Sequence, residues 1–125
     1  MMMMAATASK HAILIVDDHI DTADMLRRFL DRRGIQAQCV ATGEGALARI
    51  RSEPPCCVIL DEMMPGMTGS EVVAHIRADP AIAHTTIIMF TAGFDVSKRT
   101  TAMTQGVVAW LYKGSEQAVD EMAHW

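Results

Sequence analysis

The chain of 125 residues has few cysteines, no long apolar run and no excess of positive charge. Its three cysteines, Cys39, Cys56 and Cys57, form no spaced framework of pairs and no Cys/His pattern typical of zinc. Neighbours on a strand point to opposite faces, so Cys56 and Cys57 are not expected to pair. We therefore expect reduced thiols that pack as small core residues in a cytoplasmic protein.

The chain also lacks the usual marks of a membrane or nucleic-acid protein. No apolar run approaches the roughly 18 to 20 residues that cross a bilayer, and the first ten residues do not resemble a signal peptide. The net charge of -4 and the scattered Lys and Arg residues argue against a nucleic-acid surface. We expect a disordered tail over residues 1–9 and one domain over residues 10–125.

Apolar runs and amphipathic segments alternate along the chain. Continuous apolar runs at 13–16, 57–60 and 86–90 predict strands buried on both faces. Further strands are expected at 35–40 and 107–112. The helices predicted between and after these strands cover residues 21–33, 42–51, 70–78, 96–105 and 115–125.

The first predicted helix has clear boundaries. Asp21 is expected to cap its start and Gly34 to end it. Its apolar stripe is expected to comprise Met25, Leu26, Phe29 and Leu30. A strand followed by a helix, repeated five times, predicts an α/β fold in which helices cover both faces of a parallel sheet.

Polar residues stand where the apolar strand runs end: Asp17-Asp18, Asp61, Thr91 and Lys113. The carboxyl ends of parallel strands share one edge of a sheet, so we expect these side chains to converge. Three carboxylates suit Mg2+, which prefers oxygen ligands. Lys113 supplies a positive charge and Thr91 a hydroxyl for a phosphoryl group. The set predicts phosphoryl transfer to a carboxylate, which depends mainly on positioning and charge neutralisation.

These residues, in this order, resemble the receiver domains of bacterial response regulators in two-component signalling, including the chemotaxis type. The resemblance extends over about residues 10–123. It implies a flavodoxin-like, doubly wound (βα)5 three-layer sandwich with five parallel strands in the order 2-1-3-4-5. The motifs that carry it are Asp17-Asp18 after ILIV, DEMMPG at 61–66 with Gly69, Thr91-Ala92 after IIMF, Gly106 and Lys113.

The resemblance implies a phosphorylated regulatory domain, not an enzyme, although such a domain catalyses its own phosphotransfer and autodephosphorylation. Asp61 would accept the phosphoryl group from a histidine kinase or a histidine phosphotransfer protein. Asp17, Asp18, Asp61 and the main-chain carbonyl of Met63 would bind Mg2+. The chain would act as a cytoplasmic signalling switch.

The resemblance also assigns a switch. Thr91 would bond the phosphoryl group, with Ala92 leaving it space, and Lys113 would pair with the phosphoryl oxygens. Trp110 occupies the aromatic switch position, and a role as a large core residue is equally open. Two departures are Gly114, where the family usually has proline, and Trp110, where Tyr, Phe or His is commoner. They put the placement of Lys113 and the coupling of Thr91 to Trp110 in question.

Output is expected through contact with a protein target and not through an attached effector domain. The expected contact surface is the fourth helix, the last strand and the last helix, roughly residues 96–125. The last helix is expected to be weakly held, with Val119 and Met122 as its apolar anchors. We expect a monomer or weak dimer.

Other functions remain open beside the switch. An inert receiver-like scaffold is opposed by the complete set of candidate residues and favoured only by Gly114 and Trp110. An aspartyl-phosphate phosphatase of the haloacid dehalogenase type needs an acid where Met63 stands. No glycine-rich phosphate loop follows the first strand, which argues against nucleotide binding. His19 is expected to be an exposed loop residue and not a metal ligand, since Mg2+ does not favour imidazole.

Overall fold

The computed structural model describes residues 12–93 and 95–114. Within this part of the chain, five parallel strands form one sheet in the order β2-β1-β3-β4-β5, which confirms the expected α/β fold. The strands are β1 (Ile13–Val16), β2 (Ala37–Val40), β3 (Cys57–Leu60), β4 (Ile87–Thr91) and β5 (Ala109–Tyr112). The helices are α2 (Ile20–Arg32), α3 (Gly43–Ser52), α4 (Gly69–Ala78) and α5 (Val96–Thr104).

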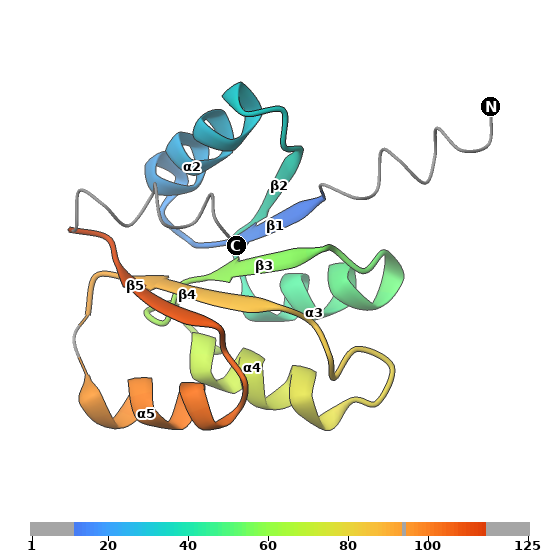
Figure 1. Cartoon of the computed structure of the whole chain (residues 1–125), viewed down its shortest axis with the longest axis vertical. Coiled ribbons are helices and arrows are strands. Elements are labelled where there is room, and N and C mark those ends of the chain that lie inside the picture. Colours follow the sequence, from blue (N-terminus) through green and yellow to red (C-terminus); the bar gives the residue numbers. More distant parts are fainter. Residues whose placement is uncertain (1–11, 94, 115–125) are drawn as a thin grey trace.

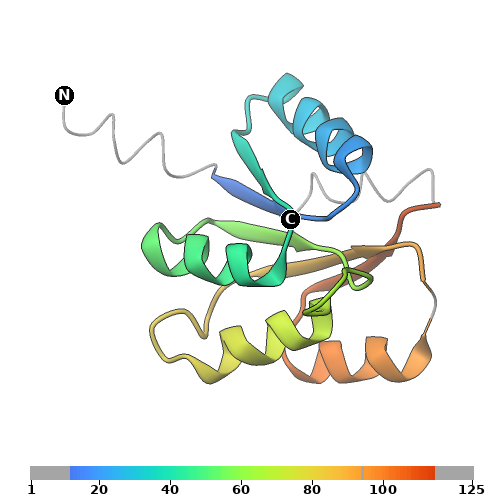
Figure 2. The same cartoon turned by 180° about the vertical axis from the view of Figure 1, so that it is seen from behind.

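The helices lie on both faces of the sheet, as Figures 1 and 2 show: α2 on one side, and α3, α4 and α5 on the other. Successive residues of β1 divide between two buried clusters, because neighbours on a strand point to opposite faces. Leu14 and Val16 pack in the cluster with α3 and α4, and Ile15 packs in the cluster with α2. The central strands β1, β3 and β4 are therefore buried on both faces, as their continuous apolar runs predict.

Two predictions for α2 are wrong. The helix begins at Ile20 with His19 as the N-cap residue, so Asp21 lies in the first turn and does not cap it. Met25 is exposed, whereas the buried residues of the helix are Ala23, Leu26 and Leu30. A spacing of three and four residues keeps these on one face, and Met25 lies about 100° away from Leu26 around the helix. The predicted end is confirmed, since Gly34 follows the helix with a φ of 75°.

The cysteine prediction holds for one residue of three. Cys57 is buried in β3, but Cys39 and Cys56 are exposed. Cys39 lies on β2, which is an edge strand of the sheet, and Cys56 precedes the first residue of β3. No residue of β2 is buried, and Cys56 lies before the buried run of β3, so apolar patterning alone overestimated the burial of Cys39 and Cys56.

The remaining elements match the predicted ones to within a few residues. Thr42 and Thr68 are N-cap residues of α3 and α4, and Thr68 forms a capping box with Glu71. None of the helices in the described part of the chain has the length and apolarity of a membrane span. The expected tail at 1–9 and the expected helix at 115–125, with Val119 and Met122, lie outside the described residues.

Candidate functional site

The carboxyl ends of the strands bring four polar side chains to one edge of the sheet. Asp17, Asp61 and Lys113 each follow directly after a strand, and Thr91 is the last residue of β4. Backbone hydrogen bonds continue the sheet through these positions, from Asp61 N to Val16 O at 2.9 Å and from Lys113 N to Thr91 O at 3.0 Å. The convergence expected from the parallel topology is therefore present.

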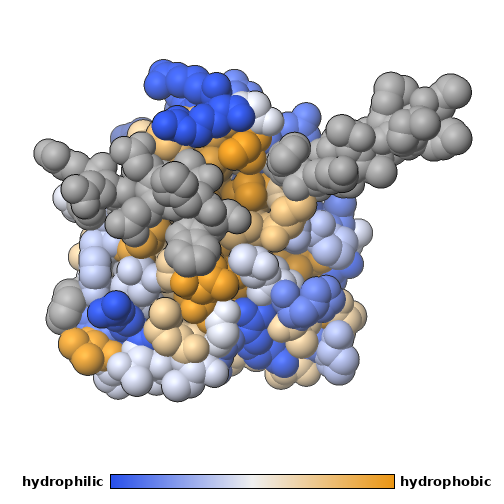
Figure 3. Space-filling model, viewed as in Figure 1, coloured by the Kyte–Doolittle hydropathy of each residue, from blue (hydrophilic) through white to orange (hydrophobic). Residues whose placement is uncertain are grey.

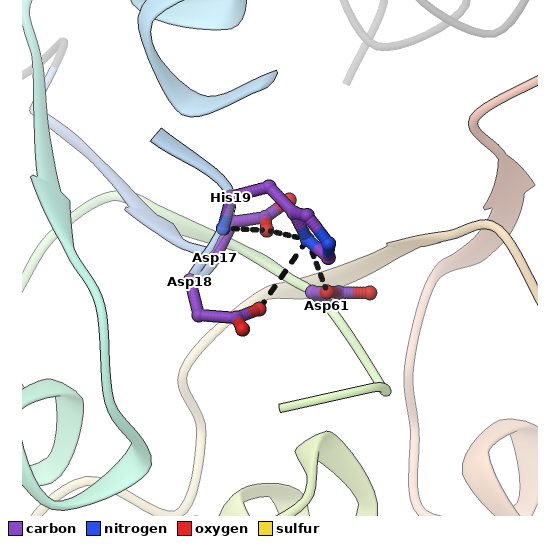
Figure 4. A group of neighbouring side chains, drawn as sticks. All are labelled: Asp17, Asp18, His19 and Asp61. Carbon is purple, nitrogen blue, oxygen red and sulfur yellow. Dashed lines mark hydrogen bonds and ion pairs between the residues drawn. The ribbon is translucent and has the colours of Figure 1, made fainter. Parts of the chain in front are cut away.

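An acidic cluster occupies this edge, as Figure 4 shows. Asp17 and Asp61 are only 4% and 2% exposed, and Asp18 is partly buried. One potential ligand atom from each of Asp17, Asp18, His19 and Asp61 lies within 4.8 Å of the others. The structure thus brings together the three carboxylates predicted from the sequence and adds an imidazole to them.

Lys113 reaches this cluster although glycine follows it in the chain. Its Nζ lies 2.8 Å from Asp17 Oδ2 and 3.4 Å from Asp61 Oδ2. The ammonium is largely buried, so its interaction with the two carboxylates is screened less than on an open surface. The doubt that Gly114 raised about the placement of Lys113 is answered by this geometry.

The surroundings of Asp61 disfavour its ionised form. Burial raises the pKa of the Asp61 carboxyl, and the negative charge of Asp17 acts in the same direction. Lys113, the Met63 N–H and the Thr91 side chain lower that pKa in part. The Met63 N–H contact is long, at 3.4 Å to Asp61 Oδ1. The cluster therefore carries more negative charge than its neighbours compensate.

Two buried oxygens show that a cation fits this cluster. Asp18 Oδ1 and Asp61 Oδ2 have no hydrogen-bond partner among the described residues. The Lys113 ammonium, 3.4 Å from Asp61 Oδ2, offsets part of the charge on that oxygen. Buried carboxylate oxygens that accept no hydrogen bond are costly, and a divalent cation bound by oxygen ligands would satisfy both. The residues present therefore suit a hard metal ion. The Met63 side chain is exposed beside the site, with its N–H directed to Asp61.

The two proposed switch residues are both buried. Thr91 is fully buried and its Oγ1 accepts a long hydrogen bond, of 3.4 Å, from Gly93 N. Trp110 packs in the core cluster on the α3–α5 side of the sheet, and its Nε1 has no hydrogen-bond partner among the described residues. This placement shows Trp110 as a core residue, and its switch role stays a prediction.

Glu62 is a site residue that sequence reasoning missed. Its side chain is almost completely buried, and Oε1 accepts hydrogen bonds from Ser70 N at 2.8 Å and Ser70 Oγ at 2.6 Å. Its Oε2 lies 3.2 Å from Lys98 Nζ on α5. The sequence shows an acidic residue directly after Asp61. It does not show that this residue pairs with Lys98, because a local pattern carries no information about a contact 36 positions away.

Gly69 allows the start of α4 to pass closely behind Asp61. A Cβ atom at this position would clash with the Asp61 carbonyl oxygen. Gly69 N also donates to Glu62 O at 3.0 Å, which holds the segment in place. A larger residue would push α4 away from the strand end that carries Asp61.

The sequence of the chain matches that of a known protein family. Residues 13–122 match the family described as response regulator receiver domain. The DNA-binding response regulator MtrA of Mycobacterium tuberculosis is 33% identical over 104 residues, which are 83% of this chain and 44% of that protein. The phosphate regulon transcriptional regulatory protein PhoB of Rhizobium meliloti is 30% identical, over 81% of this chain and 44% of its own. The chain thus spans less than half the length of these curated relatives.

Solved structures agree with this placement. A response regulator receiver protein from Pseudomonas putida superposes with a TM-score of 0.85 at 26% identity, over 92% of this chain and 93% of that one. The chemotaxis response regulator CheY4 of Vibrio cholerae gives a TM-score of 0.80 at 28% identity, over 90% and 95%. The similarity to both covers nearly the whole of each chain.

Proposed function

The chain belongs to the response regulator receiver domain family, and on that premise we propose that it is a Mg2+-dependent switch phosphorylated on Asp61. Domains of this family are regulatory phosphoacceptors and not enzymes in their own right. The observation that carries the proposal is the meeting of buried Asp61, its acidic neighbours and the Lys113 ammonium at one sheet edge.

The proposed reaction transfers a phosphoryl group from a histidine of a kinase or phosphotransfer protein. A bond forms between an Asp61 carboxylate oxygen and phosphorus, the bond from phosphorus to the histidine nitrogen breaks, and that nitrogen keeps the electron pair. The Lys113 ammonium would neutralise phosphoryl oxygens, and the Thr91 hydroxyl would donate a hydrogen bond to one of them.

Mg2+ would be held by Asp17, Asp18, Asp61 and the main-chain carbonyl of Met63. It would supply positive charge that the cluster lacks, shared between the carboxylates and the phosphoryl oxygens. The two buried oxygens without donors, Asp18 Oδ1 and Asp61 Oδ2, support this assignment. Autodephosphorylation by water would use the same residues.

We propose that output passes through protein contact on the face formed by α5 and β5, in a cytoplasmic monomer or weak dimer whose receiver domain spans residues 10–125. Val96 and Met103 on α5 and Val108 before β5 are exposed apolar residues. Figure 3 shows apolar side chains among hydrophilic ones on this side, with one apolar group where α5 begins. The net charge of -4 over the whole sequence supports protein partners over nucleic acid.

Intact mass spectrometry after treatment with acetyl phosphate and Mg2+ tests the proposal. Wild type should gain one phosphoryl group, and Asp61→Asn should gain none. Asp31→Asn, at an exposed carboxylate on α2, is the matched control and should behave as wild type. A phosphoryl gain by Asp61→Asn equal to that of wild type would refute the site. Wild type that stays unmodified by both acetyl phosphate and a kinase would favour the inert scaffold.

A further inference from the structure

His19 turns its ring back over the acidic cluster. Its backbone N–H donates to Asp17 Oδ1 at 2.9 Å. Its Nδ1 lies 3.2 Å from that same oxygen, 3.3 Å from Asp18 Oδ1 and 3.9 Å from Asp61 Oδ2. The expected exposure of His19 is confirmed, with the side chain 61% exposed, but Figure 4 shows its ring nitrogen directed at all three carboxylates.

These spacings match those of neighbouring ligands around one metal ion. Two adjacent ligand atoms of an octahedral ion, each about 2.1 Å from it, are separated by about 3 Å. Two of the three nitrogen–oxygen spacings are close to that value, and the third is longer by less than an ångström. The imidazole nitrogen therefore occupies a place that a ligand would occupy.

The second observation is which oxygens Nδ1 faces. Asp18 Oδ1 and Asp61 Oδ2, the two buried oxygens that lack a hydrogen-bond partner among the described residues, are the atoms nearest to Nδ1 on those two side chains. The Asp61 side chain is 1% exposed, so its Oδ2, which accepts no hydrogen bond from a described residue and lies 3.4 Å from Lys113 Nζ, is directed into the cluster and away from water. Two unsatisfied oxygens and one nitrogen thus converge on the same point.

A hydrogen bond alone accounts poorly for this arrangement. A ring nitrogen carries at most one proton, and one proton cannot serve three carboxylates on different sides. The oxygen nearest to Nδ1, on Asp17, already accepts the His19 backbone N–H. A single ion among the four side chains would satisfy all of these atoms together.

We propose that His19 Nδ1 is a direct ligand of the ion held by Asp17, Asp18 and Asp61. It makes the site a mixed oxygen–nitrogen site that takes first-row transition ions such as Mn2+ and Co2+ in preference to Mg2+. The affinity of a site with nitrogen and oxygen ligands for first-row divalent ions rises from Mn2+ to Co2+, whereas Mg2+ prefers oxygen. The inference rests on the proposed function for the existence of the metal site, and it adds a ligand and an ion preference to that site.

Measurement of metal binding distinguishes a ligand role of His19 from a purely structural role. The probes are Mn2+ and Mg2+, titrated calorimetrically into the full chain at pH 8 for wild type, His19→Ala and the control His84→Ala, which removes an exposed imidazole elsewhere. His19→Ala should bind Mn2+ at least about tenfold more weakly than wild type. Removing a group that only hydrogen-bonds to a metal ligand already weakens metal binding by about that factor. The Mg2+ affinity of His19→Ala should change less than about threefold, and His84→Ala should match wild type for both ions.

Pulsed electron paramagnetic resonance of the Mn2+-loaded chain gives a readout independent of phosphorylation. Wild type and His84→Ala should show coupling of the manganese to one ring nitrogen, and His19→Ala should not. Absence of that coupling in wild type, or an equal loss of Mg2+ and Mn2+ affinity in His19→Ala, would overturn the inference. In either case, if wild type binds both ions tightly, the proposed function is not contradicted. Binding of neither ion by wild type would overturn both.

Discussion

The ammonium of Lys98 lies 3.2 Å from Glu62 Oε2, so an ion pair joins α5 to the residue next to Asp61. The same Glu62 carboxylate holds the start of α4 through Ser70. Ala102 is the one residue of α5 that is buried, so little apolar packing fixes this helix. The pair therefore connects the candidate phosphorylation site to the proposed output face through a helix that is otherwise weakly anchored.

Lys98→Ala should loosen α5. The substitution leaves a buried carboxylate without its cation, but half-exposed Lys98 limits the loss of unfolding free energy to about 1 kcal/mol. Amide hydrogen exchange across Val96–Thr104 should become faster, while exchange in β1 stays unchanged. Arg99→Ala, at the neighbouring exposed position, is the control. Equal exchange rates in Lys98→Ala and Arg99→Ala would show that the ion pair does not hold the helix.

Asp61→Asn should stabilise the chain in the absence of metal, in a manner that depends on pH. Burial and Asp17 raise the pKa of Asp61. As pH rises from the ordinary carboxyl pKa through the raised one, the folded chain gives up a proton that it holds more tightly than the unfolded chain does. The free energy of unfolding of wild type therefore falls as pH rises between these two pKa values. Asparagine does not titrate, so Asp61→Asn does not lose this free energy.

The expected gain is on the order of 1 to 3 kcal/mol at pH 7.5, and it should disappear below about pH 4. Urea unfolding of wild type, Asp61→Asn and the exposed control Asp31→Asn, with a chelator present, measures it. An Asp61→Asn chain that is less stable than wild type at pH 7.5 would contradict the account of stored carboxylate repulsion.

Divalent metal should stabilise wild type more than Asp61→Asn. A ligand that binds only the folded state raises the free energy of unfolding by about 1.4 kcal/mol at ten times its Kd. Removing one of the three carboxylates weakens binding, so the rise in melting temperature with millimolar Mg2+ should be smaller in the variant. A wild-type melting temperature that does not respond to Mg2+ would count against the metal assignment.

Arg77→Lys should destabilise the chain although the charge is kept. The Arg77 guanidinium donates to four carbonyl oxygens, those of Ala83, Thr85, Gln105 and Gly106, at 2.6 to 3.4 Å. A lysine ammonium is a single point and cannot span them. Losing two or three of these bonds in a partly buried place should cost about 2 to 3 kcal/mol in chemical denaturation. Arg51→Lys, at an exposed ion pair with Asp79, should cost less than about 1 kcal/mol.

The cysteines should differ in their reactivity toward iodoacetamide. Burial raises the pKa of the Cys57 thiol to about 12, so at pH 8 roughly one thiol in ten thousand is ionised. The exposed Cys39 and Cys56 should be alkylated in the folded chain, and Cys57 only after unfolding. Peptide mapping after labelling measures this. Alkylation of Cys57 in the folded chain at the rate of Cys39 would contradict its burial.

The sequence by itself determined the order of the elements and the edge at which the candidate site forms. Continuous apolar runs mark strands buried on both faces, and a helix between each pair makes those strands parallel. Asp17, Asp61, Thr91 and Lys113 then converge, because each stands at or next to the carboxyl end of a strand. That inference needs only local pattern and the geometry of a parallel sheet.

Only the tertiary structure decided what depends on how one element packs against another. Cys39 is exposed because β2 is little covered by the rest of the fold, and Met25 is exposed because another face of α2 meets the sheet. The partner of Glu62 lies 36 residues away, and those of Arg77 include residues 28 and 29 positions away. The approach of the His19 ring to Asp61, at 3.9 Å, depends on where β3 places Asp61. Such contacts arise from packing between segments whose separation along the chain carries no periodic signal, so periodicity and spacing cannot reveal them.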